Sequence, residues 1–209
     1  MEAIHDTIMY FHKGGLVMWP LLACSIAVIS IGIERWLYYR AVDSGASFAR
    51  TYCNIMRTKG AHEASTYAKN ADGKCAAFLW EASKLQGGKE VKAAYLESRA
   101  GILLAKLRNK LDYLSIIVTM SPLLGLLGTI VGMIGAFSIF NVQAGAPLAI
   151  TGGIGEALIA TATGLCVAIM ALCAHSYFTH RLDNMLTDME QCFSAFLEAE
   201  ARSKENEAA

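Results

Sequence analysis

The feature that most constrains this chain is an almost uncharged stretch between Asp112 and Arg181. Within it, Glu156 is the one residue with a formal charge, and the other residues are largely apolar, with many glycines, alanines and threonines. About 20 apolar residues cross a bilayer as a helix, so this stretch is long enough for two crossings joined by a short linker. The sequence therefore predicts a pair of transmembrane helices.

A third apolar segment and the placement of charge complete the predicted architecture. Residues 16–33 are uncharged and are followed by Glu34 and Arg35, with aromatic residues just beyond. Hydrophobic residues make up 55% of the 209 residues and charged residues 17%, which is typical of an integral membrane protein. We predict an all-α membrane protein with three transmembrane helices and long cytoplasmic helical extensions.

The distribution of lysine and arginine predicts how these helices are oriented. Most of the 18 basic residues lie in 41–112, whereas 141–153 contains none and the N-terminal segment contains only Lys13. Basic residues collect on the cytoplasmic side, so we expect the N-terminus outside and the C-terminus inside. The predicted segments are 1–15 as a periplasmic amphipathic segment, 16–39 as transmembrane helix 1, 40–112 as a cytoplasmic helical domain, 113–141 as transmembrane helix 2, 142–153 as a periplasmic linker, 154–180 as transmembrane helix 3, and 181–209 as a cytoplasmic C-terminal helix and tail.

Two helices are expected to extend beyond the apolar stretch. No glycine pair interrupts the sequence from Lys89 to Asn141, so it predicts one long helix, which Pro122 kinks. An apolar helical period continues past the third span to about Ala201, so we expect this helix to leave the membrane and pack against 89–112. The polar residues after Ala201 are expected to be disordered.

Glycines mark the face on which the two later spans approach each other. Gly125, Gly128, Gly132 and Gly135 recur at helical spacing on the second span, and Gly164 lies in a stripe of small residues on the third. In lipid, helices associate where small residues let their backbones come close. The stripes predict a tight hairpin or a tight contact between subunits, and packing alone is the simplest role for most of these residues.

Threonines on both spans lie near similar predicted depths. Thr129 is on the second span, and Thr161 and Thr163 are on the third. At 100° per residue, Glu156 and Thr163 share a helix face, whereas Thr161 points about 140° away from Glu156. Threonine in a membrane helix commonly bonds its own i−4 carbonyl and does nothing more. Polar groups on two neighbouring spans nevertheless favour a polar-lined channel.

Glu156 needs a specific environment. A carboxylate at bilayer depth costs at least ~2.5 kcal/mol, and the predicted spans contain no lysine or arginine in their apolar parts to pair with it. It is expected near the outer interface, along a hydrated path, or against another chain. No nucleotide-binding, nucleophile or metal motif occurs, so the sequence predicts no catalytic residue, no metal site and no cofactor. Zero net charge gives no sign of a nucleic-acid partner.

The motifs SPLLGLLGT at 121–129 and GIGEALIATATGL at 153–165 resemble the MotA/TolQ/ExbB proton channel family, and within it ExbB first and TolQ next. Glu34 and Arg35 after the first span agree with this resemblance, which covers essentially the whole chain. By motif, Thr129 and Thr161 match the family's pore-facing threonines, and Glu156 matches its third-span glutamate. Thr163 replaces a more usual apolar residue, so its role stays open.

The resemblance implies a homopentamer in the bacterial inner membrane. The pentamer would surround a dimer of single-span, ExbD- or TolR-like partners whose transmembrane aspartate carries the proton, and the proton gradient would replace a cofactor as the energy source. The complex would use the energy of proton flow to act on a TonB- or TolA-like protein. The expected function is ExbB-like energisation of transport across the outer membrane. The alternatives are a TolQ-like role in envelope constriction, a three-span scaffold without ion conduction, and a small-solute transporter.

Overall fold

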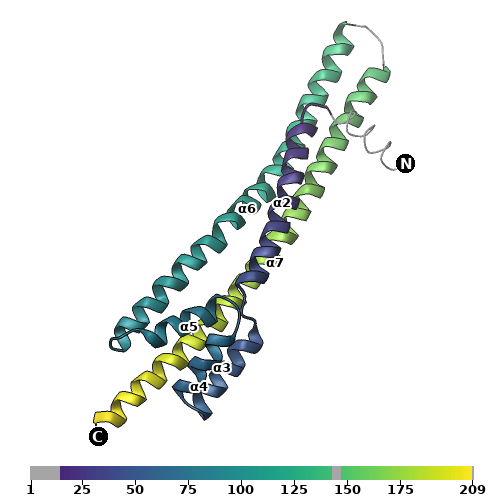
Figure 1. The fold of residues 1–209 in the computed structure, drawn as a ribbon. Coiled ribbons are helices and arrows are strands. Elements are labelled where there is room, and N and C mark those ends of the chain that lie inside the picture. Colours follow the sequence, from purple (N-terminus) through teal and green to yellow (C-terminus); the bar gives the residue numbers. More distant parts are fainter. Residues whose placement is uncertain (1–14, 143–146, 209) are drawn as a thin grey trace. The chain divides into compact units, whose positions relative to one another are not determined.

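The computed structural model describes residues 15–142 and 147–208. Almost all of the predicted amphipathic segment, and part of the predicted linker, lie outside the described residues. The described residues form helices and contain no strand (Figure 1). The helices are α2 (Met18–Val42), α3 (Ala46–Thr58), α4 (Ala61–Asn70), α5 (Lys74–Lys84), α6 (Lys89–Val142) and α7 (Pro147–Ala208).

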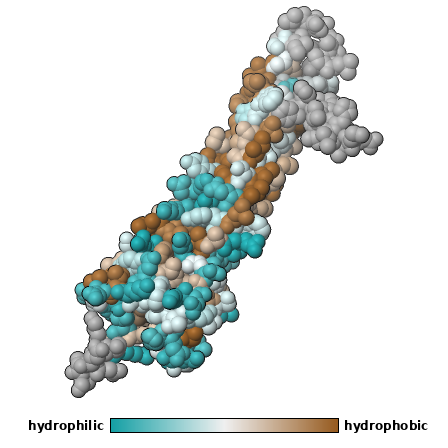
Figure 2. Space-filling model, viewed as in Figure 1, coloured by the Kyte–Doolittle hydropathy of each residue, from teal (hydrophilic) through white to brown (hydrophobic). Residues whose placement is uncertain are grey.

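The chain divides into two compact units. The first contains Met1–Ile33 and Leu111–Tyr177, and the second contains Glu34–Lys110 and Phe178–Ala209. Within residues 15–142 and 147–208, three helices are long and apolar enough to cross a membrane, with mean hydropathies of 1.5, 2.1 and 2.2, which confirms that part of the prediction. Hydrophobic residues cover much of the visible surface of the first unit, whereas hydrophilic residues gather on the second (Figure 2).

Helix α6 is continuous, as the absence of a breaker predicted. It runs through Pro122, which has no N–H, so the carbonyl of Val118 lacks its usual helical donor. Helix α7 differs from the expectation at both ends. It begins at Pro147 rather than near Ile154, because proline is well suited to the first position of a helix. It also continues to Ala208, so the expected disorder after Ala201 is wrong; alanine, lysine and glutamate in this tail are good helix formers.

The second unit begins each of its short helices with a glycine. Gly45, Gly60 and Gly73 precede α3, α4 and α5 with φ of +80°, +90° and +97°, a conformation that glycine adopts without steric cost. The helices bury apolar residues against α6 and α7. The buried set includes Tyr52, Leu79, Leu96, Leu182, Cys192 and Phe196.

In this unit α6 and α7 pack along their extensions, as the sequence predicted. Leu103 and Leu107 of α6 line a small cavity together with Leu182 and Met185 of α7. Farther along, buried Lys92 forms a 2.6 Å ion pair with Glu200. The apolar period of both sequences therefore continues as a packed helix pair beyond the uncharged stretch.

Candidate functional site

The closest approach of α6 and α7 in the first unit occurs where both carry glycine. A Cβ added to Gly164 would lie 2.6 Å from the carbonyl oxygen of Ser121 and 3.0 Å from the Cα of Gly125. A Cβ added to Gly125 would lie 3.1 Å from the Cα of Thr161. The 2.6 Å contact leaves no room for a side chain at Gly164 unless the helices separate, whereas a Cβ at Gly125 would be tight and would push the neighbouring backbone by a few tenths of an ångström.

The other glycines of the predicted stripe have different surroundings. A Cβ on Gly132 would lie 3.1 Å from the carbonyl oxygen of Gly153, and one on Gly128 would overlap the Cβ of Ala160. A Cβ on Gly135 would meet no described atom of another segment within 4 Å. Gly128 and Gly132 therefore pack against α7, whereas Gly135 does not lie in this contact.

Thr161 joins the two helices through its hydroxyl group. The half-buried Thr161 Oγ1 donates to the carbonyl of Gly125 on α6 at 3.0 Å and lies 3.2 Å from the carbonyl of Ala157 on its own helix. The missing side chain of Gly125 is what lets this hydroxyl reach the α6 backbone. Thr161 thus occupies the seam between the helices, with part of its surface still accessible.

The other two threonines bond within their own helices. Thr129 Oγ1 donates to the carbonyl of Leu126 at 2.6 Å, and Thr163 Oγ1 donates to the carbonyl of Ile159 at 2.8 Å. Both side chains are partly exposed. Each hydroxyl retains acceptor lone pairs, so each is able to accept a hydrogen bond from water or from another chain.

Glu156 lies beside the start of α2. Its carboxylate touches Gly15, where a Cβ would overlap it, and Gly15 also has a φ of +71°. The Gly15 carbonyl accepts from the N–H of Met18 at 3.2 Å and so begins the first turn of α2. A carboxylate close to a helix N-terminus is stabilised by the helix dipole. Among the described residues, Glu156 has no ion pair or hydrogen bond, and it is half-buried.

Ser121 is a polar residue of this seam that sequence reasoning missed. It is fully buried, and its hydroxyl has no partner among the described residues. It precedes Pro122 and lies one helical turn before Gly125, and this position in the glycine stripe was the available signal. Because a buried hydroxyl without a partner is costly, Ser121 marks a polar point inside an otherwise apolar contact.

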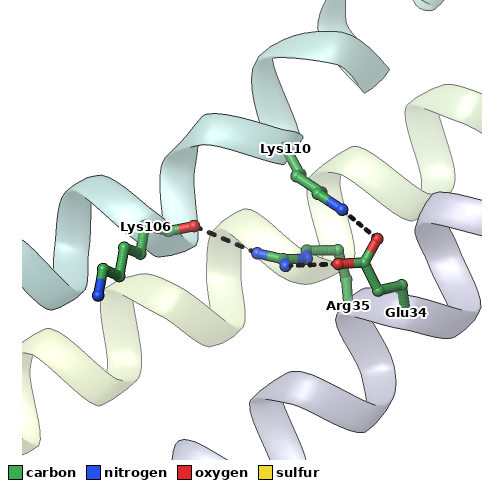
Figure 3. Close-up of polar contacts among 4 residues, drawn as sticks. All are labelled: Glu34, Arg35, Lys106 and Lys110. Carbon is green, nitrogen blue, oxygen red and sulfur yellow. Dashed lines mark hydrogen bonds and ion pairs between the residues drawn. The ribbon is translucent and has the colours of Figure 1, made fainter.

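The second unit carries a charged cluster where the sequence becomes polar (Figure 3). Arg35 is 5% exposed; its Nη1 donates to the carbonyl of Lys106 at 3.3 Å, and its Nη2 pairs with Glu34 at 3.1 Å. Lys110 pairs with the other oxygen of Glu34. The end of α2 is therefore joined to α6 by the hydrogen bond from Arg35 to the Lys106 carbonyl and by the ion pair between Glu34 and Lys110, which the sequence did not reveal.

Two thiols, half-buried Cys53 and buried Cys192, also lie between α3 and α7 in the second unit. Cys53 Sγ lies 3.7 Å from the carbonyl of Gln191, and Cys192 Sγ lies 4.0 Å from that of Ala49. Burial raises the pKa of the Cys53 thiol to about 11, so it is protonated at neutral pH and is a weak nucleophile. In the part of the chain that the structure describes, no three metal-ligating side chains form a metal site.

A scan against protein families matches residues 70–191 to the MotA/TolQ/ExbB proton channel family. The ExbB-like 1 biopolymer transport protein of Synechocystis sp. is 36% identical over 78% of this chain, and the match spans 66% of that relative. The biopolymer transport protein exbB1 of Vibrio cholerae is 26% identical over 84% of this chain and 80% of its own length. The Tol-Pal system protein TolQ of Haemophilus influenzae is 37% identical over 44% of this chain and 39% of its own.

Proposed function

This chain belongs to the MotA/TolQ/ExbB proton channel family, and we propose that it is the ExbB-like subunit of a motor driven by the proton-motive force. The motor would lie in the bacterial inner membrane and energise TonB-dependent transport across the outer membrane. The ExbB-named relatives of Synechocystis sp. and Vibrio cholerae match 78% and 84% of this chain, whereas the TolQ of Haemophilus influenzae matches 44% of it. This difference favours the ExbB-like function.

The observation that carries this proposal is the polar content of the seam between α6 and α7. Thr161 and Ser121 supply hydroxyl groups at this seam, Thr129 adds one from elsewhere on α6, and Glu156 is the one carboxylate of the uncharged stretch. Hydroxyl groups relay hydrogen bonds, but they do not themselves carry a proton at neutral pH. Glu156 lies against Gly15 at the start of α2, and in this proposal the carrier that takes the proton past the threonines comes from a second polypeptide. An ExbD-like dimer of single-span proteins in the pore of a homopentamer would supply it.

In this proposal, each candidate residue has a distinct role. Thr129 and Thr161 face the proton path, and Glu156 faces a neighbouring helix or subunit at its outer end. Gly125 and Gly164 let α6 and α7 approach closely enough for Thr161 to reach the α6 backbone. Thr163 accepts hydrogen bonds from water. Pro122 leaves a backbone carbonyl available in the middle of α6.

The proposed topology places the N-terminus and residues 142–153, which include the first turns of α7, on the periplasmic side. The 40–112 domain and the helix after 181 lie in the cytoplasm, as the basic residues indicate. No cofactor is needed, because a proton moving down the membrane potential releases about 2.3 kcal/mol per 100 mV. The output passes to a TonB-like protein.

Co-purification tests the assembly. The full chain is expressed with an ExbD-like single-span protein, extracted in detergent and measured by native mass spectrometry. A ring of five copies holding two copies of the partner is expected. A chain that is monomeric with and without the partner contradicts the proposal.

A TolQ-like function is the second candidate, favoured by the identity to TolQ of 37% over 93 residues. Deleting the gene separates the two. Loss of TonB-dependent uptake with normal division supports the ExbB-like function, whereas defective envelope constriction with normal uptake supports the TolQ-like one. A chain that assembles but supports neither process would act as a scaffold.

A further inference from the structure

A polar groove lies between α3 and α7 in the second unit. Its volume is about 440 Å³. Arg50, Asn54 and Arg57 line it from α3 at spacings i, i+4 and i+7, so they share one helix face. The lining from α7 is also mostly polar and consists of Gln191, Ser194, Ala195 and Glu198. The groove therefore suits a charged segment better than an apolar ligand.

The two arginines of the groove have unused hydrogen-bonding capacity. Neither Arg50 nor Arg57 forms an ion pair with any described residue. Asp188 interacts with Arg50 electrostatically, from beyond ion-pair distance. The guanidinium group prefers two-point binding of carboxylates. Seven residues of helix span about 10 Å, so the groove fits two carboxylates about that far apart.

Helix α6 has an exposed face that matches this requirement. Glu90 and Glu97 have the same seven-residue spacing, and Ala94 and Gly101 continue the face. A Cβ added to Gly101 would meet no described atom within 4 Å. Neither glutamate has an ion pair within the described ranges 15–142 and 147–208. Small residues between the glutamates let another helix approach closely.

We propose that the groove between α3 and α7 holds α6 of a second copy of this chain, with Glu90 and Glu97 of that copy paired to Arg50 and Arg57. The matched charges and matched spacing select this occupant. This inference rests on the proposed function, because it requires an assembly that contains more than one copy of the chain. It adds the surface through which the cytoplasmic helices of neighbouring copies meet.

The groove and the side of α7 that packs against α6 of the same chain lie on opposite faces of α7. Leu182 and Met189 face α6 of the same chain, whereas Gln191 and Glu198 line the groove. At 100° per residue, these two faces are about half a turn apart. A contact between two different patches is head-to-tail and closes into a ring when the rotation permits. Each copy is thus able to hold one neighbour in its groove while its own α6 is held by another.

Cross-linking in membranes tests this docking. Asn54→Cys and Ala94→Cys are introduced together into a Cys53→Ser background of the full chain, and the membranes are oxidised mildly with copper phenanthroline. Covalent dimers are expected, because these residues occupy the middle of the two matched faces. R50E/R57E in the same chain should lower the dimer yield about tenfold. Adding E90R/E97R should restore it.

Two controls make the result specific. K59E/K74E reverses two exposed charges outside the groove and should leave the dimer yield unchanged. D183R/E190R tests the other exposed acidic pair with seven-residue spacing, which lies on α7. If D183R/E190R restores the dimer yield of the R50E/R57E chain and E90R/E97R does not, then α7 of the second copy occupies the groove and the proposal is wrong. Circular dichroism checks that every variant keeps its helical content.

The remaining outcomes separate this inference from the proposed function. A wild-type chain that forms oligomers by native mass spectrometry, without a cross-link between the introduced cysteines, overturns the docking alone. A dimer yield that R50E/R57E leaves unchanged also overturns the docking alone. A chain that is monomeric in every condition overturns both the docking and the ring.

Discussion

At the scale of the residue, the position of each glycine determines how close α6 and α7 come. Gly164 faces the backbone of Ser121, and Gly125 faces the backbone of Thr161. Backbone atoms cannot rotate out of the way as a side chain does. A methyl group at Gly164 therefore has to displace helix backbone, whereas one at Gly125 makes a tight contact with it.

Gly164→Ala should destabilise the chain by about 1–3 kcal/mol, because its Cβ would lie 2.6 Å from the Ser121 carbonyl. Gly135→Ala is the matched control. It should stabilise α6 by roughly 0.5–1 kcal/mol, because no described atom is near and alanine favours the helix. Thermal unfolding in detergent measures both. Equal effects of the two substitutions would contradict the close contact.

Asp188→Asn should raise the melting temperature at neutral pH. Burial, with repulsion from Asp43, raises the pKa of Asp188 above its ordinary value, and Arg50 only partly opposes this. A carboxyl whose folded pKa is raised favours folding when protonated, so its contribution falls as pH rises through the folded pKa. The substitution should also flatten the dependence of the melting temperature on pH above about 4. Asp72→Asn, at an exposed position, is the control and should change neither the melting temperature nor its dependence on pH.

Individual polar contacts were harder to predict than the residues that make them. Thr161 could be chosen from the sequence by its motif, but its bond to the Gly125 carbonyl depends on the rotation of one helix against the other. Ser121 was missed because a serine before a proline reads as a local feature. Gly135 continues the glycine spacing but lies outside the contact between the helices. The spacing of glycines in the sequence does not show where two helices diverge, so this could not be predicted.

At the scale of the element, α2 is fastened to α6 at the polar end of its apolar segment. Arg35 provides the buried link, with a hydrogen bond to the Lys106 carbonyl and an ion pair to Glu34. Lys110 adds a more exposed ion pair to Glu34. The buried link is expected to dominate, because exposed ion pairs contribute little.

Arg35→Met should cost about 1.5–3 kcal/mol, since it removes a charge-assisted hydrogen bond from a buried position. Lys110→Met should cost less than about 1 kcal/mol. Unfolding followed at low and high salt measures both. The cost of Lys110→Met should shrink at high salt, whereas that of Arg35→Met should largely persist. A larger effect for Lys110→Met would show that the exposed pair dominates.

The long helices could be predicted because each is marked by a long uncharged or helically periodic stretch of sequence. The sequence predicts α6 as one helix, because Pro122 is the one helix-disfavouring proline in it and no glycine pair interrupts it. The start of α7 was placed too late because Gly152 and Gly153 were read as part of a linker. Tertiary packing overrides such local signals, and both glycines lie inside the helix.

At the scale of the whole molecule, the chain supplies few polar groups in its apolar stretch. Its basic residues lie outside that stretch, and Glu156 is the one carboxylate within it. A chain of this kind works with a second polypeptide. That dependence, rather than conduction by the chain alone, is the central claim.

Proton flux into liposomes tests this claim most directly. The chain is reconstituted with and without the single-span partner, and flux is driven by a potassium diffusion potential. Flux should be low for the chain alone and rise at least tenfold with the partner. T129V/T161V should abolish the increase, whereas T163V, the matched control, should retain most of it. Equal flux with and without the partner, or full partner-dependent flux in T129V/T161V, would contradict the account.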